Sequence, residues 1–126
     1  MSWPTVVAIA FGAALGALAR WGAGLWLNGL WRGFPLGTLA VNCVGGMLIG
    51  VAMFGFARHP DELLRHFAVT GFLGGLTTFS AFSGESLGLL QRGELPMAVA
   101  HTLAHVAGAL ACAAAGFWLA KVLWRA

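Results

Sequence analysis

The chain alternates between long apolar stretches and short polar segments. Four stretches lack Lys, Arg, Asp and Glu over nearly their whole length, and the charged residues gather between them. A bilayer core about 30 Å thick needs roughly 20 apolar residues of helix to cross it. The pattern therefore predicts four transmembrane helices, at about residues 4–27, 36–57, 66–90 and 96–120.

The spacing of these stretches predicts one all-α integral membrane domain over residues 1–126. The connections between the stretches are short, so each helix is expected to pack against its neighbours in sequence. An even number of spans places both termini on the same side of the membrane. We expect a multi-pass protein of the inner, or plasma, membrane.

Composition narrows the class of protein further. Of the 126 residues, 60% are apolar and 9% are charged. Soluble domains carry roughly 45–50% apolar and about 25% charged residues. The net charge of +3 comes from seven basic and four acidic side chains, with no basic cluster. These values argue against a soluble enzyme, a disordered chain and a nucleic-acid-binding protein.

The basic residues outside the spans divide unequally between the two sides of the membrane. The side of the termini holds Arg58, Arg65, Lys121 and Arg125, and the other side holds Arg32 and Arg92. Four against two is a small excess by the positive-inside rule. It is compatible with a cytoplasmic N-terminus and also with insertion in both orientations.

Glycine is abundant, with 19 residues, and several glycines recur at a spacing of four. Small residues at this spacing allow helix backbones to approach closely in lipid. Packing within one subunit accounts for most of them, but four thin helices enclose little aqueous space. A polar pathway would form more readily between subunits, which favours an oligomer. The pairs are Gly12/Gly16, Gly46/Gly50, Gly71/Gly75 and Gly84/Gly88.

The third stretch is predicted to contain a helix break in mid-membrane. Gly74 and Gly75 weaken the helix there, and four hydroxyl residues follow within residues 77–83. Hydroxyl side chains can bond backbone carbonyls in place of the helical pattern. A break inside a membrane is tolerated where it is buried or lines a cavity. Carbonyls freed at such a break can coordinate a cation.

Four polar side chains inside the spans need a reason. Thr38 and Asn42 share one face of the second helix, where they act either as interhelical hydrogen-bond donors or as the lining of a polar path. Arg20 either reaches toward an interface or provides a positive charge near the access route of an anion. Glu85 is the only acid within a span, so it is a candidate partner for Arg20.

Two pairs of rings are spaced to share a helix face. Phe79 and Phe82 lie three residues apart, a spacing typical of packing, although aromatic ring edges carry positive charge that can hold an anion. His101 and His105 lie four residues apart. No third ligand such as Asp or Cys is near them in sequence, so we interpret them as polar lining that responds to pH rather than as a metal site.

Taken together, three segments resemble motifs of the Fluc (CrcB) family of fluoride channels. GALARW at 16–21 is similar to its first-helix motif, and GTLAVN at 37–42 is similar to its second-helix motif. GFLGGLTTFSAF at 71–82 is similar to its third-helix motif and is the most specific of the three. The resemblance extends over nearly the whole chain.

The resemblance implies a homodimer whose two subunits are inserted antiparallel, in a dual topology, with two fluoride pores at the interface. It implies a structural sodium ion at the centre, held by the backbone carbonyls of Gly74 and Thr77. The ring edges of Phe79 and Phe82 would face the fluoride ion. Asn42 would donate a hydrogen bond to the ion. Arg20 would lie in the vestibule, and Glu85 beside the third-helix track. The remaining positions implied along the path are Thr38, Ser80 and Ser83.

The fourth helix departs from the family pattern. Members of the family often place a tyrosine and serine hydroxyls there, at four-residue spacing. This chain has His101, His105 and Ala109 at those positions. A neutral imidazole still donates one N–H, so we expect His101 and His105 to line the pore.

The implied function is passive export of fluoride, without enzymatic activity. The sequence contains no GxxxxGK[ST] motif for ATP binding, and no acid pair or activated nucleophile is evident. One alternative is a transporter of the small multidrug-resistance type, which needs an acidic residue in its first helix, and residues 4–27 contain none. A second alternative is an accessory membrane subunit that packs with a partner and conducts no ion by itself.

Overall fold

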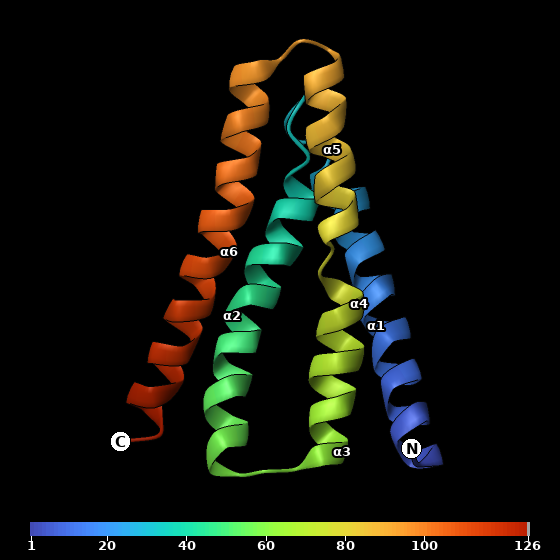
Figure 1. The fold of residues 1–126 in the computed structure, drawn as a ribbon, viewed down its shortest axis with the longest axis vertical. Coiled ribbons are helices and arrows are strands. Elements are labelled where there is room, and N and C mark those ends of the chain that lie inside the picture. The colour runs from blue at the N-terminus through green and yellow to red at the C-terminus, as the bar shows by residue number, and fades with distance from the viewer. Residues whose placement is uncertain (126) are drawn as a thin grey trace.

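The computed structural model describes residues 1–125, which contain helices and no strands (Figure 1). The chain forms three long helices and one segmented helical run. In order, the elements are α1 (Trp3–Leu27), α2 (Leu36–Arg58), α3 (Glu62–Arg65), η1 (His66–Leu73), α4 (Gly74–Leu76), α5 (Phe79–Gln91) and α6 (Leu95–Leu123).

The helices run up and down along one long axis. Figure 1 shows α1 and the run from α3 to α5 ascending beside each other, with α2 and then α6 descending on the other side of the run. Both ends of the chain therefore lie at the same end of the molecule, together with the 59–61 connection. The 28–35 and 92–94 connections lie at the opposite end.

Helices α1, α2 and α6 are each long and apolar enough to cross a membrane. Their observed bounds agree with the predicted spans at 4–27, 36–57 and 96–120 to within a few residues. The predicted span at 66–90 differs, because it forms the shorter pieces η1, α4 and α5, with the short helix α3 directly before them. In η1 the backbone is wound as a π-helix, and two residues without helical structure separate α4 from α5.

Local sequence explains where several helices begin and end. Ser2 caps α1 by accepting a hydrogen bond from the Thr5 N–H, and Asp61 caps α3 by accepting one from the Leu64 N–H at 2.9 Å. Such side-chain caps satisfy backbone donors that have no helical partner. Gly93 turns the chain from α5 into α6 with a φ of +73°, a conformation that favours glycine.

Glycines set how closely α1 approaches the run from η1 to α4. Gly12 and Gly16 of α1 lie directly against the backbone at Phe67 and Phe72. From the opposite side, a Cβ on Gly71 would come within 2.7 Å of the Ile9 carbonyl oxygen. No side chain larger than hydrogen fits between these backbones without displacing one of them.

The same kind of packing joins α2 to α6. A Cβ on Gly46 would lie 2.6 Å from the Ala109 carbonyl oxygen, and Gly50 lies directly against the backbone at Ala113. Gly116 of α6 meets the Met47 carbonyl in return. Three of the four glycine pairs singled out in the sequence thus pack inside the subunit, and the fourth pair, on α5, does not.

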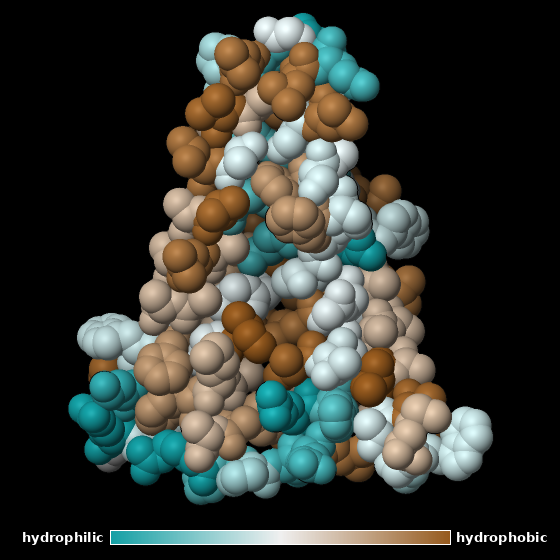
Figure 2. Space-filling model, viewed as in Figure 1, coloured by the Kyte–Doolittle hydropathy of each residue, from teal (hydrophilic) through white to brown (hydrophobic). Residues whose placement is uncertain are grey.

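The surface is mostly apolar. Figure 2 shows hydrophobic side chains over much of the visible face, with hydrophilic side chains gathered toward the two ends of the molecule. Large apolar side chains exposed along the long helices include Phe11 on α1 and Leu110 on α6. This distribution is that of a protein surrounded by lipid rather than by water.

Candidate functional site

The helix break lies at Thr77 and Thr78, two residues after the Gly74–Gly75 pair that predicted it. Both threonines have extended backbone, with ψ of 156° and 118°. The Thr77 side chain donates to the Leu73 carbonyl at 2.8 Å, which the Thr77 N–H also contacts at 3.0 Å. Thr78 begins α5 as its cap, because its hydroxyl accepts the Ala81 N–H at 3.0 Å.

Asn42 of α2 pairs with the backbone of Thr78 on both sides of its amide. The Thr78 N–H donates to Asn42 Oδ1 at 2.8 Å, and Asn42 Nδ2 donates to the Thr78 carbonyl at 3.1 Å. Because an N–H can only donate, this pairing defines which end of the amide is the oxygen. The sequence left Asn42 either as interhelical glue or as pathway lining, and the structure shows the interhelical bonds.

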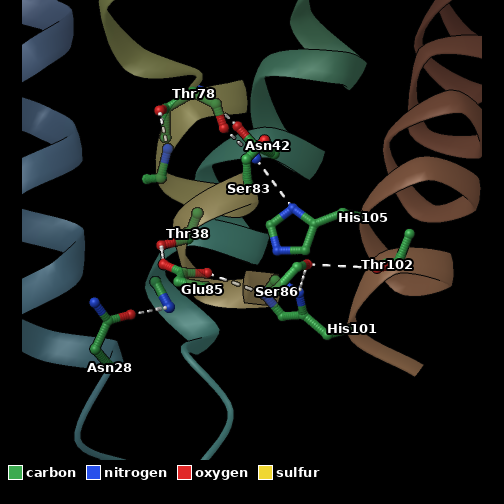
Figure 3. Close-up of polar contacts among 12 residues, drawn as sticks. Asn28, Thr38, Asn42, Thr78, Ser83, Glu85, Ser86, His101, Thr102 and His105 are labelled. Carbon is green, nitrogen blue, oxygen red and sulfur yellow. Dashed lines mark hydrogen bonds and ion pairs between the residues drawn. The ribbon is translucent and has the colours of Figure 1, made fainter. Parts of the chain in front are cut away.

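The Asn42 amide also determines the tautomer of the neutral His105 ring. Asn42 Nδ2 lies 3.1 Å from His105 Nδ1 (Figure 3). Since Nδ2 is a donor, His105 Nδ1 accepts, and the neutral ring carries its proton on Nε2. His105 is 3% exposed, and its Nε2 has no hydrogen-bond partner within residues 1–125. The site therefore holds one buried N–H donor that is unsatisfied.

The break also leaves two carbonyls without their usual helical donors. In an α-helix the carbonyl of residue i accepts the N–H of residue i+4. For Gly74 that N–H belongs to Thr78, and it donates to Asn42 instead. For Thr77 it belongs to Ala81, and it donates to the Thr78 hydroxyl instead. These are the two carbonyls that the family resemblance implies for sodium.

A second polar cluster lies one to two helical turns farther along α5. The Thr38 hydroxyl donates to Glu85 Oε1, and His101 Nε2 lies 3.0 Å from Glu85 Oε2. A carboxylate only accepts, so His101 donates from Nε2, and its Nδ1 accepts from the Ser86 hydroxyl at 2.8 Å. His101 is completely buried. Figure 3 shows these side chains converging from α2, α5 and α6.

Aromatic rings connect the two polar clusters. The Phe82 ring stacks on His101 at 5.4 Å between centroids and contacts His105 at 4.7 Å. Phe34 meets His101 edge-on at 5.3 Å. Phe79 lies 5.3 Å from Phe82, yet it is 78% exposed, whereas Phe82 is 7% exposed. The two phenylalanines that share a sequence motif thus have opposite environments.

Sequence reasoning did not identify Ser86 and Phe34, which hold His101 in place. A weak signal existed for Ser86, because it follows Phe82 by four residues and so shares its helix face. No signal existed for Phe34, which lies in the connection before α2.

The predicted serines lie apart from the buried clusters. Ser80 and Ser83 are exposed on α5. Ser83 donates to the Phe79 carbonyl at 2.8 Å, and the Ser80 hydroxyl lies 3.1 Å from that of Thr78. Their bonds are therefore local to the start of α5. Whatever else these hydroxyls contact must approach from outside the subunit.

Arg20 lies near Glu85 without pairing with it. The two residues line one cavity of about 410 Å³ together with Thr38. Within residues 1–125 no ion pair joins them, and Arg20 Nε has no hydrogen-bond partner. The partnership with Arg20 suggested for Glu85 is therefore wrong in this subunit, because Thr38 and His101 occupy the carboxylate.

A groove of about 500 Å³ opens along the break. It is lined by residues of the break and by residues of α2 and α6, including Asn42, Thr77, Thr78, Phe79 and His105. The groove brings the break, the amide and the unsatisfied imidazole to one surface. An ion in it would lie among Asn42, His105 and the rings of Phe79 and Phe82, and the described lining residues include no Lys or Arg.

The histidine pair has a third neighbour that the sequence spacing did not show. One ligand atom from each of Glu85, His101 and His105 lies within 4.8 Å of the other two. The expectation that no third candidate ligand lies near the pair is therefore wrong. Glu85 is distant in sequence, but its helix α5 brings it beside the histidines of α6.

Comparison with known proteins gives one consistent family. The model of the family described as CrcB-like protein, Camphor Resistance (CrcB), matches residues 7–117. "Fluoride-specific ion channel FluC" of Bordetella petrii is 50% identical over 119 residues, covering 93% of this chain and 91% of that protein. The protein of the same name from Chromobacterium violaceum is 50% identical over 125 residues, covering 94% and 99%. That from Chromohalobacter salexigens is 52% identical over 116 residues, covering 90% and 88%.

Proposed function

The chain belongs to the CrcB-like family and is a multi-pass protein of the cell membrane, and we propose that it is a passive, fluoride-selective ion channel. Its physiological role would be the export of fluoride. The observation that carries this proposal is the buried, unsatisfied Nε2–H of His105, a residue that also lines the groove along the break.

Fluoride is small and strongly hydrated, so a channel must replace its water shell with hydrogen-bond donors. We propose that His105, which lines the groove in contact with the Phe82 ring, turns its Nε2–H to the ion. Ring edges carry partial positive charge and hold an anion weakly. A full positive charge at the same place would bind fluoride too tightly for rapid release. This donor set favours conduction rather than storage.

We propose that the histidines of α6 take the place of hydroxyl donors in the fluoride path. The tautomer of His105 is suited to this task, because Asn42 directs its proton to Nε2, which has no partner within residues 1–125. His101 donates its Nε2–H to Glu85, so it would have to release that carboxylate to donate to fluoride. Thr38 joins the same path through its bond to Glu85.

The active form is proposed to be an antiparallel homodimer with a pore on each side of its interface. Support comes from the exposed face of α5, where Phe79 is 78% exposed and Ser80 and Ser83 are exposed beside it. Gly84 of the same face has open space around it. A second copy would cover these residues and close the groove into a pore. Fluoride would pass between Phe79 of one copy and the polar cluster of the other.

We also propose that the run from Glu62 to Gln91 crosses the membrane as a fourth span. It runs from the end of the molecule that holds the N-terminus to the opposite end, and its first half lies beside α1 (Figure 1). A helix break in lipid requires partners for the freed backbone groups. Asn42 and the threonine hydroxyls supply such partners at Thr77 and Thr78.

A structural sodium ion would occupy the centre of the dimer. The Gly74 and Thr77 carbonyls fit this role, because the N–H groups that would normally bond them donate elsewhere. Backbone carbonyls are suitable oxygen ligands for an alkali cation. When bound, the ion would supply positive charge that holds the two helix breaks together.

Fluoride efflux from liposomes tests the proposal. Purified protein is reconstituted into vesicles loaded with fluoride, and parallel vesicles are loaded with chloride. We expect rapid fluoride efflux without added energy and no chloride efflux. Absence of fluoride efflux from protein shown to be folded and dimeric would overturn the channel proposal and favour an accessory subunit.

A further inference from the structure

We propose that Glu85, His101 and His105 form a binding site for a divalent transition-metal ion of the zinc class. This site is separate from the sodium site proposed at the helix break. It uses three side chains that the structure brings together from α5 and α6. Binding of the metal does not depend on the proposed function, whereas its effect on fluoride transport does.

The three ligands are already close to the required arrangement. His101 and His105 lie one turn apart on α6, with ring centroids 4.5 Å apart. Glu85 Oε2 lies 3.0 Å from His101 Nε2, and one ligand atom from each of the three residues lies within 4.8 Å of the others. Ligands about 2.0–2.2 Å from a shared Zn²⁺ lie about 3–3.5 Å apart. Small side-chain movements would therefore complete the site.

An independent observation points to a ligand at this position. His105 is only 3% exposed, yet its Nε2 has no hydrogen-bond partner within residues 1–125. Figure 3 shows this nitrogen on the side of the ring that faces Glu85 and His101. A buried polar atom without a partner costs free energy unless something binds it.

The donor set selects the class of metal. Two imidazoles and one carboxylate, with a fourth position open, form a ligand set that binds Zn²⁺. Mg²⁺ and Ca²⁺ prefer oxygen ligands alone. Partners that orient the ligands are also present, because Ser86 Oγ lies 2.8 Å from His101 Nδ1 and Thr38 donates to the second oxygen of Glu85.

Metal binding would change the proton arrangement around His105. The free ring carries its proton on Nε2 and accepts at Nδ1 from Asn42. A metal takes the lone pair of Nε2, so the proton moves to Nδ1, where it faces the Asn42 Nδ2–H group. Two donors cannot bond each other, so Asn42 and His105 must separate. Metal and fluoride would therefore use the same ring nitrogen in opposite tautomers.

The ion can reach the ligands from the surface of the subunit. Glu85 lines cavities of about 410 and 560 Å³, and His105 lines the groove of about 500 Å³. If the groove is the fluoride path, an ion held there blocks it. We therefore expect zinc to inhibit transport from within the pore.

Direct binding is the first test, made on full-length dimer without a histidine tag. Zn²⁺ is titrated calorimetrically, and Co²⁺ is added as a spectroscopic substitute. We expect one ion per chain and a visible Co²⁺ absorption of a four-coordinate site. Glu85→Gln and His105→Gln should each weaken binding about 100-fold, since even loss of an outer partner costs 10–100-fold.

The two remaining histidines provide the matched control. His59 is exposed at the end of α2, and His66 begins η1. The double variant His59→Gln/His66→Gln should bind Zn²⁺ as the unaltered protein does. Loss of binding in this variant, or equal binding in the dimeric Glu85→Gln protein, would overturn the site. If Glu85→Gln does not form a dimer, His105→Gln decides in the same way.

Fluoride efflux is the second readout and separates the two proposals. We expect Zn²⁺ to inhibit efflux at the concentrations at which it binds. Binding without inhibition would overturn the block and retain the site. Protein that binds Zn²⁺ yet shows no efflux even without metal would overturn the channel and not the metal site. No binding to protein that conducts fluoride would overturn the metal site alone.

Discussion

The two halves of the segmented run from α3 to α5 are built in different ways. Before the break, η1 and α4 pack against α1 through glycines, with Gly71 and Gly75 meeting its backbone directly. After the break, a Cβ added to Gly84 of α5 would meet nothing within 4 Å. Polar side chains attach this second half to α2 and α6 instead.

The first half therefore has a structural role, and the second half carries the surface proposed to conduct the ion. Close backbone packing holds the first half in one position and leaves no room for an ion between it and α1. The second half is held at a few polar points, and its outer face remains free. Backbone packing before Thr77 therefore determines the position of the run, and the polar side chains after Thr77 form the proposed ion site. Substitutions in the first half should mainly change stability, and those in the second half should mainly change transport.

Asn42→Asp should have the largest effect. The carboxylate replaces both Nδ2–H donors, so it faces the Thr78 carbonyl and His105 Nδ1 with negative charge. It also repels an anion in the groove that Asn42 lines. We expect fluoride efflux to fall by at least about 100-fold, equivalent to about 2.7 kcal/mol. Efflux from liposomes measures this directly.

Gln91→Glu is the control for added charge. Gln91 is exposed at the end of α5, so the same change in charge occurs far from the break. It should leave efflux within about twofold, because an exposed charge is screened by salt and water. Equal efflux from both variants would show that Asn42 has only a structural role.

Gly16→Ala tests the first half and should mainly affect stability. Its new Cβ would lie directly against the Phe72 carbonyl oxygen and within 2.7 Å of the Leu76 N–H nitrogen. Overpacking of this kind costs about 1–3 kcal/mol. We expect lower thermal stability of the purified protein, measured by size exclusion after heating. Protein that remains folded should still conduct fluoride.

Gly22→Ala provides the comparison within the same helix. A Cβ at Gly22 has nothing within 4 Å, and alanine favours helix more than glycine does. This variant should be as stable as the unaltered protein or more stable. Equal losses of stability in Gly16→Ala and Gly22→Ala would contradict the close packing of α1 against η1 and α4.

Phe82→Ile should reduce efflux about tenfold while the protein remains folded and the proposed dimer intact. The substitution removes a ring that stacks on His101 and contacts His105. Aromatic contacts of this kind contribute about 0.5–1.5 kcal/mol beyond burial, and 1.36 kcal/mol corresponds to a tenfold change in rate. Phe79→Ile should act in the same direction through the ion path.

Phe11→Ile is the matched control for these rings. Phe11 is 63% exposed on α1, away from the break. It should leave efflux unchanged. Unchanged efflux in both Phe79→Ile and Phe82→Ile would remove the assignment of the rings to the pore.

The sequence was sufficient for the long helices, because their signal is additive along the chain. Apolar stretches fix α1, α2 and α6 to within a few residues without reference to any neighbour. The helix break was also predictable. Gly74 and Gly75 mark it, and it occurs two residues later, where the threonine hydroxyls and Asn42 take over the backbone bonds.

The polar clusters were only partly predictable, because they depend on how helices face each other. Asn42, His101 and His105 were found as polar residues in apolar spans. Which of them meet was not evident, since Glu85 and His101 come together only through the register of α5 against α6. The π-helical winding of η1 was not predicted either, because no simple residue pattern specifies it.

Thr78→Ala should have the smallest effect. It distinguishes the role of the Thr78 side chain from that of the Thr78 backbone. The hydroxyl caps α5 through the Ala81 N–H, and loss of such a cap costs about 1 kcal/mol. Asn42 holds only the backbone of Thr78, so its two bonds remain. We expect a small loss of thermal stability, restored by Thr78→Ser, with efflux changed by less than about threefold. If Thr78→Ser were as unstable as Thr78→Ala, the cap would not explain the effect, and the start of α5 would depend on the threonine methyl group instead.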